Sequence, residues 1–576
     1  MHLLIKYARK VLPIFFFLNA TAQLTPYEKD PQKNTTATYQ EMIDYYQTLA
    51  KKYPKQSKLF TCGKTDVGKP LQLFVLSKSG EFSPEKLKKS GNAIFLINNG
   101  IHPGEPEGID ASMMLARDLL AKNALPDNEV IAIITAYNLG GMLNRGESRV
   151  NQNGPVTYGF RGNRRNLDLN RDFIKTDSKN SYSFQEIFNS WDPDVFLDNH
   201  TSDGADYQYI MTLIDTQRDK LTPILGKYMK EKFTDELYKR MATKDYKLIP
   251  YIDFPGETPE SGIEAYLETP RYSTGFAALH NTIAYMPETH MWKPFQQRVE
   301  STYQLMVYLK DIIHEQGNTL LATRRKAKDY VKNQTTFPLR WKLDTTKYAN
   351  IPFYGYEAEH KPSEVSGLTR LYYNRDRPFT RTIKLYDRYQ ASLTINKPKA
   401  YIIPQCYDKA ISLLQLNHVK LMPIKQDTIV HAEVYYIKDF PTNTQPYEGH
   451  YLHHDITLEK KMMDVPFYKG DYMAFTNQES NRYLIETLEP EGVDSYFCWN
   501  FFDGILSRKE YFSPYIFEDK AAELLKKNPQ LRTDLDNAID KNPSLKNDAH
   551  GQLEWIYQHS NFFEKTYKLY PIARIL

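Results

Sequence analysis

Residues 93–105 read AIFLINNGIHPGE, an apolar run followed at once by a turn and by polar side chains. The run Ala93 to Ile97 is short and contains no polar residue, which predicts a buried strand. After Glu105, apolar residues recur at helical spacing over Ile109 to Ala121, and Pro106 suits a first helical turn. A strand that leads directly into a helix is typical of α/β folds, which bind ligands at the carboxyl ends of their strands.

Short apolar runs and helical patterns alternate through residues 23–325. We predict further strands at 71–76, 130–137, 195–198 and 282–287, and further helices at 39–52, 221–232 and 294–315. This alternation predicts an α/β catalytic domain over residues 23–325, with a mixed, largely parallel sheet covered by helices on both faces.

The sequence changes character from about residue 333. Runs rich in tyrosine and threonine, such as 401–403 and 431–437, recur between turn signals. They predict a β-rich second domain over residues 333–576, in which helical character returns only at 520–527 and in the polar stretch that follows.

The first 22 residues carry Lys6, Arg9 and Lys10 ahead of an apolar stretch and the small residues Ala20-Thr21-Ala22. This pattern predicts a secretory signal peptide over residues 1–22 and a secreted or periplasmic protein. An uncleaved anchor is the weaker alternative, because the apolar stretch is far shorter than a bilayer span.

The formal net charge is +4, and three of the positive residues lie in the first 22. A nearly neutral remainder gives no electrostatic basis for binding nucleic acid. The three cysteines, Cys62, Cys406 and Cys498, are widely separated. They describe neither a disulfide framework nor a zinc ribbon, and we expect them to be buried as small apolar residues.

His102 and Glu105 are three residues apart, a spacing that can aim an imidazole and a carboxylate at one point. About a hundred residues later, the apolar run 195–198 is followed by Asn199 and His200. Two histidines and a carboxylate at the ends of strands can hold a divalent metal ion, and a catalytic zinc needs three such ligands and an open position.

Residues 160–173 read FRGNRRNLDLNRDF. Asp168 and Asn170 alternate with Leu167 and Leu169, so in an extended segment the two polar side chains share one face. Four arginines near these residues form a potential anion site, because guanidinium groups bind carboxylates through paired hydrogen bonds.

Together these motifs resemble the zinc carboxypeptidases, the carboxypeptidase A-like metallopeptidases. The matching segments are HPGE at 102–105, LDLNRDF at 167–173 and LDNH at 197–200, and the resemblance covers residues 40–315. It implies one zinc ion per chain, held by His102, Glu105 and His200.

The same resemblance implies roles for the arginine-rich segment. Asp168 is expected to orient His102, and Asn170 with Arg171 to bind the terminal carboxylate of a peptide. Arg161 is expected to polarise the scissile carbonyl, although Arg164 and Arg165 compete for this role.

Two glutamates are candidates for the general base of the reaction. Glu288 follows a late strand and precedes a long helix, which is the context that the resemblance implies. Glu268 is the second candidate, because an arginine and a tyrosine follow it. Tyr266 and Tyr272 are equally suited to contact the substrate.

The sequence therefore predicts a zinc-dependent carboxypeptidase whose partner is a peptide with a free C-terminal carboxylate. A zinc amidase or deacylase acting on acylated amino acids or cell-wall peptides is the first alternative. The second is a non-catalytic peptide- or glycan-binding protein, in which Trp499, Phe501 and Phe502 would stack on sugars.

Overall fold

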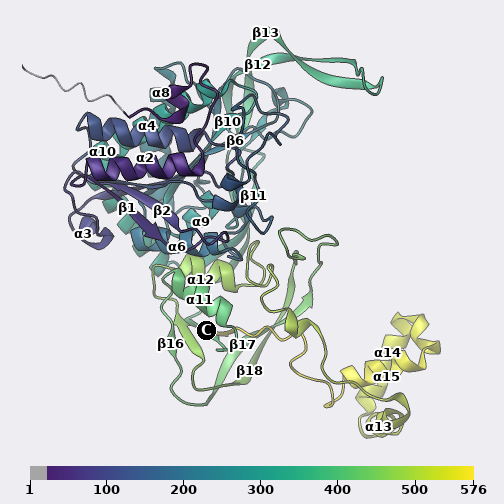
Figure 1. Ribbon diagram of the computed structural model, residues 1–576. Helices are drawn as coiled ribbons and strands as arrows, with labels where there is room; N and C mark the ends of the chain where they lie inside the picture. The colour runs from purple at the N-terminus through teal and green to yellow at the C-terminus, as the bar shows by residue number, and fades with distance from the viewer. Residues whose placement is uncertain (1–22) are drawn as a thin grey trace, which may run out of the picture.

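The computed structural model describes residues 23–576, so the predicted signal peptide lies outside the described residues (Figure 1). A nine-stranded sheet forms its centre, in the order β1-β2-β4-β3-β5-β10-β7-β8 with β6 beside β10. The strands are β1 Ser57–Cys62, β2 Leu71–Leu76, β3 Ala93–Asn98, β4 Glu129–Ile134, β5 Val195–Asp198, β6 His200–Ser202, β7 Met211–Asp215, β8 Leu248–Pro250 and β10 Ile283–His290.

The sheet is mixed and largely parallel, as predicted. Strands β4, β3, β5 and β10 run parallel to one another, and β6 continues β5 along β10. The pairs β1–β2, β2–β4 and β10–β7 are antiparallel. Because β3, β5 and β10 are parallel, their carboxyl ends lie at one edge of the sheet.

Helices cover both faces of this sheet, and the alternation along β3 shows why. Phe95 and Ile97 belong to one apolar core, whereas Ile94 and Leu96 belong to another on the opposite face. The first core is covered by α2 (Tyr39–Lys52), α4 (Glu107–Ala121), α7 (Pro223–Met229), α8 (Asp235–Ala242) and α10 (Phe295–Asn333). The second is covered by α6 (Lys179–Trp191) and α9 (Ser273–Leu279).

The C-terminal half is β-rich, as predicted, and contains three further sheets. Strands β11 (Thr336–Leu343) and β14 (Tyr389–Asn396) pair with each other, and β12 (Ala349–Pro362) and β13 (Thr369–Tyr386) form a long hairpin that projects from the molecule, with β9 (Ile263–Glu264) beside β13 (Figure 1). The six-stranded sheet contains β15 (Ala400–Ile403), β16 (Met422–Pro423), β17 (Thr428–Asp439), β18 (Thr457–Phe467), β19 (Tyr472–Phe475) and β20 (Ala573–Ile575).

Two helices of this half contradict the expectation that helical structure returns only late in the chain. They are α11 (Asp408–Leu416) and α12 (Asn481–Leu488). Their apolar residues, including Leu414 and Leu484, join the core that also contains Phe184 of α6 and Phe276 of α9. Apolar burial against the first half explains these short helices, since helices of eight or nine residues are not stable alone.

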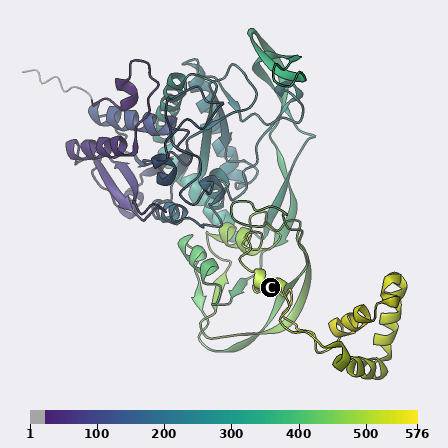
Figure 2. The ribbon, with the colours of Figure 1, turned by 45° about the vertical axis from the view of Figure 1, so that its right-hand side comes forward.

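The late helical segment forms a small unit of its own. Helices α13 (Pro514–Lys527), α14 (Pro529–Lys541) and α15 (Ala549–Gln558) enclose a separate apolar core. This unit stands apart from the rest of the molecule in both views (Figure 2). The chain then returns to the six-stranded sheet as β20.

The aromatic segment at 498–502 is part of the core. Trp499 and Phe502 are fully buried, so their rings are not available for stacking on sugars. All three cysteines are free; Cys498 is buried, but Cys406 is exposed, so the expectation of burial is wrong for Cys406. Within residues 23–576, no helix combines the length and apolar character needed to cross a bilayer.

Candidate metal centre and active site

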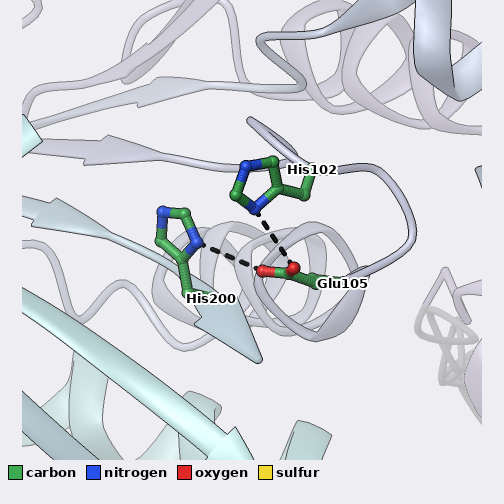
Figure 3. Close-up of side chains that lie close together, drawn as sticks. All are labelled: His102, Glu105 and His200. Carbon is green, nitrogen blue, oxygen red and sulfur yellow. Dashed lines mark hydrogen bonds and ion pairs between the residues drawn. The ribbon is translucent and has the colours of Figure 1, made fainter. Parts of the chain in front are cut away.

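His102, Glu105 and His200 converge at the carboxyl edge of the sheet (Figure 3). His102 and Glu105 lie in the turn between β3 and α4, and His200 begins β6. The Nδ1 atoms of His102 and His200 each lie 3.1 Å from a different oxygen of Glu105. All three side chains are buried, and their ligand atoms lie within 4.8 Å of one another.

Each histidine is oriented by a carboxylate on its other ring nitrogen. Nε2 of His102 is 2.9 Å from Oδ1 of Asp168, and Nε2 of His200 is 3.0 Å from Oδ2 of Asp198. Histidines that bind metals usually donate their second N–H to such a partner. Two Nδ1 atoms and one carboxylate, held in this way, fit a zinc ion with an open coordination position.

Asp198 was not identified from the sequence as part of this site. An available signal was its spacing two residues before His200 at the end of a strand, which places both side chains on one face. Its second oxygen accepts a hydrogen bond from Asn98 of β3, so the carboxylate is fixed from two strands.

Two arginines place positive charge beside Glu105. Nη2 of Arg149 lies 2.8 Å and Nη1 of Arg161 lies 3.4 Å from Oε1 of Glu105. Burial alone would raise the pKa of Glu105, but His102, Arg149 and the hydrogen bond from His200 hold that pKa well below its usual value. Arg149 was also missed, because its loop has no periodicity and belongs to no motif.

The segment around Asp168 is not extended, contrary to the expectation from its alternation. Residues Leu169–Arg171 form a 3₁₀ turn, and Asp168 caps it by accepting the N–H of Asn170 at 2.8 Å. The turn buries Asn170, whose Oδ1 accepts the N–H of Ser273 at 3.2 Å. Asn170 and Arg171 still reach the same cavity as the candidate metal-binding triad.

Glu288 and Glu268 both line that cavity, in different surroundings. Glu268 accepts hydrogen bonds from the N–H and the hydroxyl of Thr274 at the start of α9. Within residues 23–576, no hydrogen bond reaches the carboxylate of Glu288. Burial raises the pKa of Glu288 to about 8, with Glu105 and Glu268 adding to the rise and His200 opposing it.

The cavity has a volume of about 300 Å³ and gathers nearly all the predicted site residues. Among the three candidate arginines, Arg161 lines it, whereas Arg165 donates to the backbone of Asp177 and Arg164 is exposed. Tyr266 and Tyr272 both line it, with ring centroids 6.0 Å apart, so both rings are placed where a substrate would contact them. Tyr251 also lines the cavity.

Known proteins with similar sequences are carboxypeptidases. Carboxypeptidase 2 of Trichophyton tonsurans is 23% identical over 452 residues, which cover 75% of this chain and 78% of that protein. Carboxypeptidase 2 of Trichophyton equinum matches to the same extent. Among solved structures, carboxypeptidase A from Helicoverpa armigera covers 51% of this chain and 77% of its own, with 14% identity and a TM-score of 0.38.

A family model gives the broader result. The model described as zinc carboxypeptidase matches residues 42–356, more than half of the chain. The matched region contains the His102, Glu105 and His200 triad and the whole cavity around it. The chain belongs to the zinc carboxypeptidase family.

Proposed function

We propose that this zinc metallopeptidase removes the C-terminal residue from peptides that end in a free carboxylate, after export from the cytoplasm. Two observations support the proposal. A buried triad that could hold a metal ion, His102, Glu105 and His200, shares one cavity with the polar side chains of Asn170 and Arg171. The export pattern of residues 1–22 supports the location. We assign the chemistry to a catalytic domain over residues 23–325.

His102, Glu105 and His200 would hold the zinc ion, with Asp168 and Asp198 fixing the two imidazoles. Zinc, when bound, supplies Lewis-acid chemistry that activates water and polarises a carbonyl. Because the triad is buried, competing water is limited and charges act more strongly than they would in bulk solvent.

Glu288 is the residue that we propose as general base. It would take a proton from the attacking water and deliver it to the leaving amine nitrogen. Its carboxylate lines the same cavity as the triad, and no described residue hydrogen-bonds to it, so it is available for this transfer. Glu268 is less suited, because Thr274 already occupies one of its oxygens.

Arg161 would face the carbonyl oxygen as negative charge develops on it. Its guanidinium is held by two hydrogen bonds to Oδ2 of Asp168, at 2.8 and 3.0 Å, and so approaches the triad in a fixed orientation. A preorganised donor at such a position stabilises the transition state by about 3–4 kcal/mol.

Asn170 and Arg171 would bind the terminal carboxylate of the peptide. The Oδ1 of Asn170 is taken by Ser273, which turns its amide N–H groups toward other acceptors. Arg171 lies against the ring of Tyr272, with its Cζ 4.4 Å from the ring centroid. An anion that enters here meets two fixed donors.

The test compares blocked peptides that end in a free carboxylate with the same peptides ending in an amide. The wild-type enzyme should release the last residue from the first set and cleave the second at least about a hundredfold more slowly, because the amide lacks the charge that Arg171 binds. Mass spectrometry of the products identifies the bond that is cut.

Arg171→Ala should remove this preference, and Arg164→Ala, with its exposed side chain, is the matched control. Equal cleavage of free and amidated peptides by the wild-type enzyme would contradict the carboxypeptidase proposal. Cleavage of acylated amino acids without cleavage of peptides would favour the amidase alternative.

A further inference from the structure

A hairpin from the C-terminal half reaches the active site of the first half. Thr442 pairs with His453 and Tyr447 pairs with His450 across it, and we name it the 442–453 hairpin. Its tip contacts the segment 168–171, which is more than 270 residues away in the chain.

Tyr447 contacts Arg171, the proposed carboxylate-binding residue. The Nε of Arg171 donates a hydrogen bond to the hydroxyl of Tyr447 at 2.9 Å. With the ring of Tyr272 against its guanidinium and the backbone oxygen of Asn170 accepting from Nη1, Arg171 is held from three directions. Tyr447 therefore fixes the direction in which the remaining N–H groups of Arg171 point.

Glu448 contacts Asp168, which orients His102. The backbone N–H of Asp168 donates to Oε2 of Glu448 at 2.7 Å. Glu448 thereby fixes the position of the residue whose carboxylate holds both His102 and Arg161.

The backbone of Glu448 adds an independent observation. Glu448 and Gly449 have φ values of +50° and +83°, as a tight hairpin turn with two left-handed residues requires. Asn, Asp and Gly tolerate the first of these positions, whereas a glutamate there is strained by about 1 kcal/mol or more. Asparagine would suit this backbone conformation better. The contact between the carboxylate of Glu448 and the backbone of Asp168 therefore accounts for a glutamate at this strained position.

The hairpin is anchored on both halves of the molecule. Nε2 of His450 lies 2.7 Å from Oδ2 of Asp177, which also binds Lys175 and Lys409. His453, which is buried, contacts the hydroxyl of Thr442 at 2.8 Å and Asp503 at 3.1 Å. These contacts hold the tip in place.

We propose that the 442–453 hairpin completes the peptidase active site, with Tyr447 positioning Arg171 and Glu448 positioning Asp168. This rests on the proposed function of Arg171 and Asp168. The C-terminal half is then part of the active site. The Tyr447 contact supports binding of the substrate carboxylate, and the Glu448 contact supports binding of the metal ion.

The test uses the full-length zinc-loaded enzyme and a peptide with a free C-terminus. Tyr447→Phe should raise KM about tenfold and leave kcat within about twofold, because a hydrogen bond to a charged binding residue is lost. Tyr451→Phe is the matched control, since Tyr451 lies in the same hairpin and is 51% exposed; it should match the wild type.

Glu448→Asn separates positioning from stability. Asparagine suits the left-handed backbone, so Tm should stay the same or rise, while kcat/KM and Zn²⁺ affinity, measured by competition with a chelator, should each fall about tenfold. Glu448→Gln keeps an acceptor oxygen, so it should retain most of the wild-type kcat/KM and Zn²⁺ affinity. A hairpin that only joins the two halves would instead change Tm and leave these values at the wild-type level.

The outcomes distinguish this proposal from the proposed function. If the wild type does not cleave peptides but Glu448→Asn still weakens Zn²⁺ binding, the carboxypeptidase function fails and the positioning by the hairpin stands. If Tyr447→Phe and Glu448→Asn match the wild type in KM, kcat and Zn²⁺ affinity, the proposal is overturned.

Discussion

Hydrogen bonding distinguishes the two candidates for the general base, Glu268 and Glu288. Glu268 is tied to the first turn of α9 through Thr274, where a carboxylate also meets the positive end of the helix. Glu288 lies in β10 opposite His200 of β6, so its position follows from strand register. A proton acceptor must be free to bond with water, which favours Glu288.

Glu288→Gln should lower kcat by about 10²–10⁴-fold, since a positioned general base contributes that much, and leave zinc content unchanged. Glu268→Gln keeps the acceptors for Thr274 and should lower kcat by less than about tenfold. Steady-state kinetics and metal analysis of both variants check this. The reverse ranking of the two variants would assign the base to Glu268.

The residues of the site were predictable where they end strands or belong to short motifs. His102, Glu105 and His200 follow apolar runs, and parallel strands bring such ends together. Arg149 was not predictable, because an irregular loop carries it to Glu105. Tyr447 and Glu448 were not predictable either, because only the packing of the two halves brings them to the site.

At the scale of elements, the buried carboxyl group of Asp110 links α4 to the segment that precedes α2. Asp110 of α4 is fully buried and accepts hydrogen bonds from the hydroxyl of Thr36 at 2.5 Å and the N–H of Ala37 at 3.4 Å. Burial raises the pKa of Asp110 to about 7. The segment that leads into α2 is thereby tied to α4.

This raised pKa predicts a pH-dependent stability. A carboxyl group whose pKa is higher in the folded than in the unfolded state stabilises the folded protein at low pH. This contribution is complete below the unfolded pKa of about 3.9 and is lost as pH rises through the folded pKa. Between pH 5 and pH 8, the free energy of unfolding of Asp110→Asn should therefore rise by about 3 kcal/mol relative to that of the wild type. Thermal unfolding at both pH values measures the difference.

The matched control is Asp44→Asn, because Asp44 is exposed on α2. Its stability relative to the wild type should be the same at pH 5 and pH 8. A constant difference between Asp110→Asn and the wild type at the two pH values would show that Asp110 does not titrate in this range.

Elements were predicted best where periodicity alone determines them. Helix α2 and strand β2 have the predicted bounds, since each pattern stops at a clear turn. Helix α10 continues far beyond residue 315 to Asn333, because buried residues such as Leu320 and Ala327 extend its apolar face. Helices α11 and α12 were not predicted, because they are short and depend on tertiary burial.

At the scale of the whole molecule, the two halves share a core, and the last strand lies inside a sheet. Strand β20 lies between β15 and β17, and Nε of Arg574 lies 3.1 Å from the buried carboxylate of Glu489. By contrast, the unit α13–α15 has its own core, and its two ends meet where Lys509 N–H donates to Glu564 at 2.9 Å.

These arrangements predict opposite effects of two changes. Replacing residues 510–563 by a short Gly-Ser linker should leave Tm and peptidase kcat nearly unchanged, because that unit packs on itself. Arg574→Ala should destabilise the protein by about 3–5 kcal/mol, because it leaves a buried carboxylate unpaired. Thermal unfolding and kinetics check both, and loss of activity on excision would show that the helical unit serves the active site.

The sequence predicted a β-rich second half but not the way it is joined to the first. The change in composition near residue 333 reports local propensity, whereas the shared core depends on contacts between residues such as Phe276 and Leu484. For the same reason, no pattern indicated that a hairpin tip would return to residues 168–171.

The central claim is that His102, Glu105 and His200 hold one zinc ion at the edge of the sheet. Anomalous diffraction from crystals of the zinc-loaded protein, measured on both sides of the zinc absorption edge, locates the ion directly. The account predicts one strong peak bounded by Nδ1 of His102, Nδ1 of His200 and the carboxylate of Glu105. Zinc bound elsewhere, with no peak between these three side chains, would contradict it.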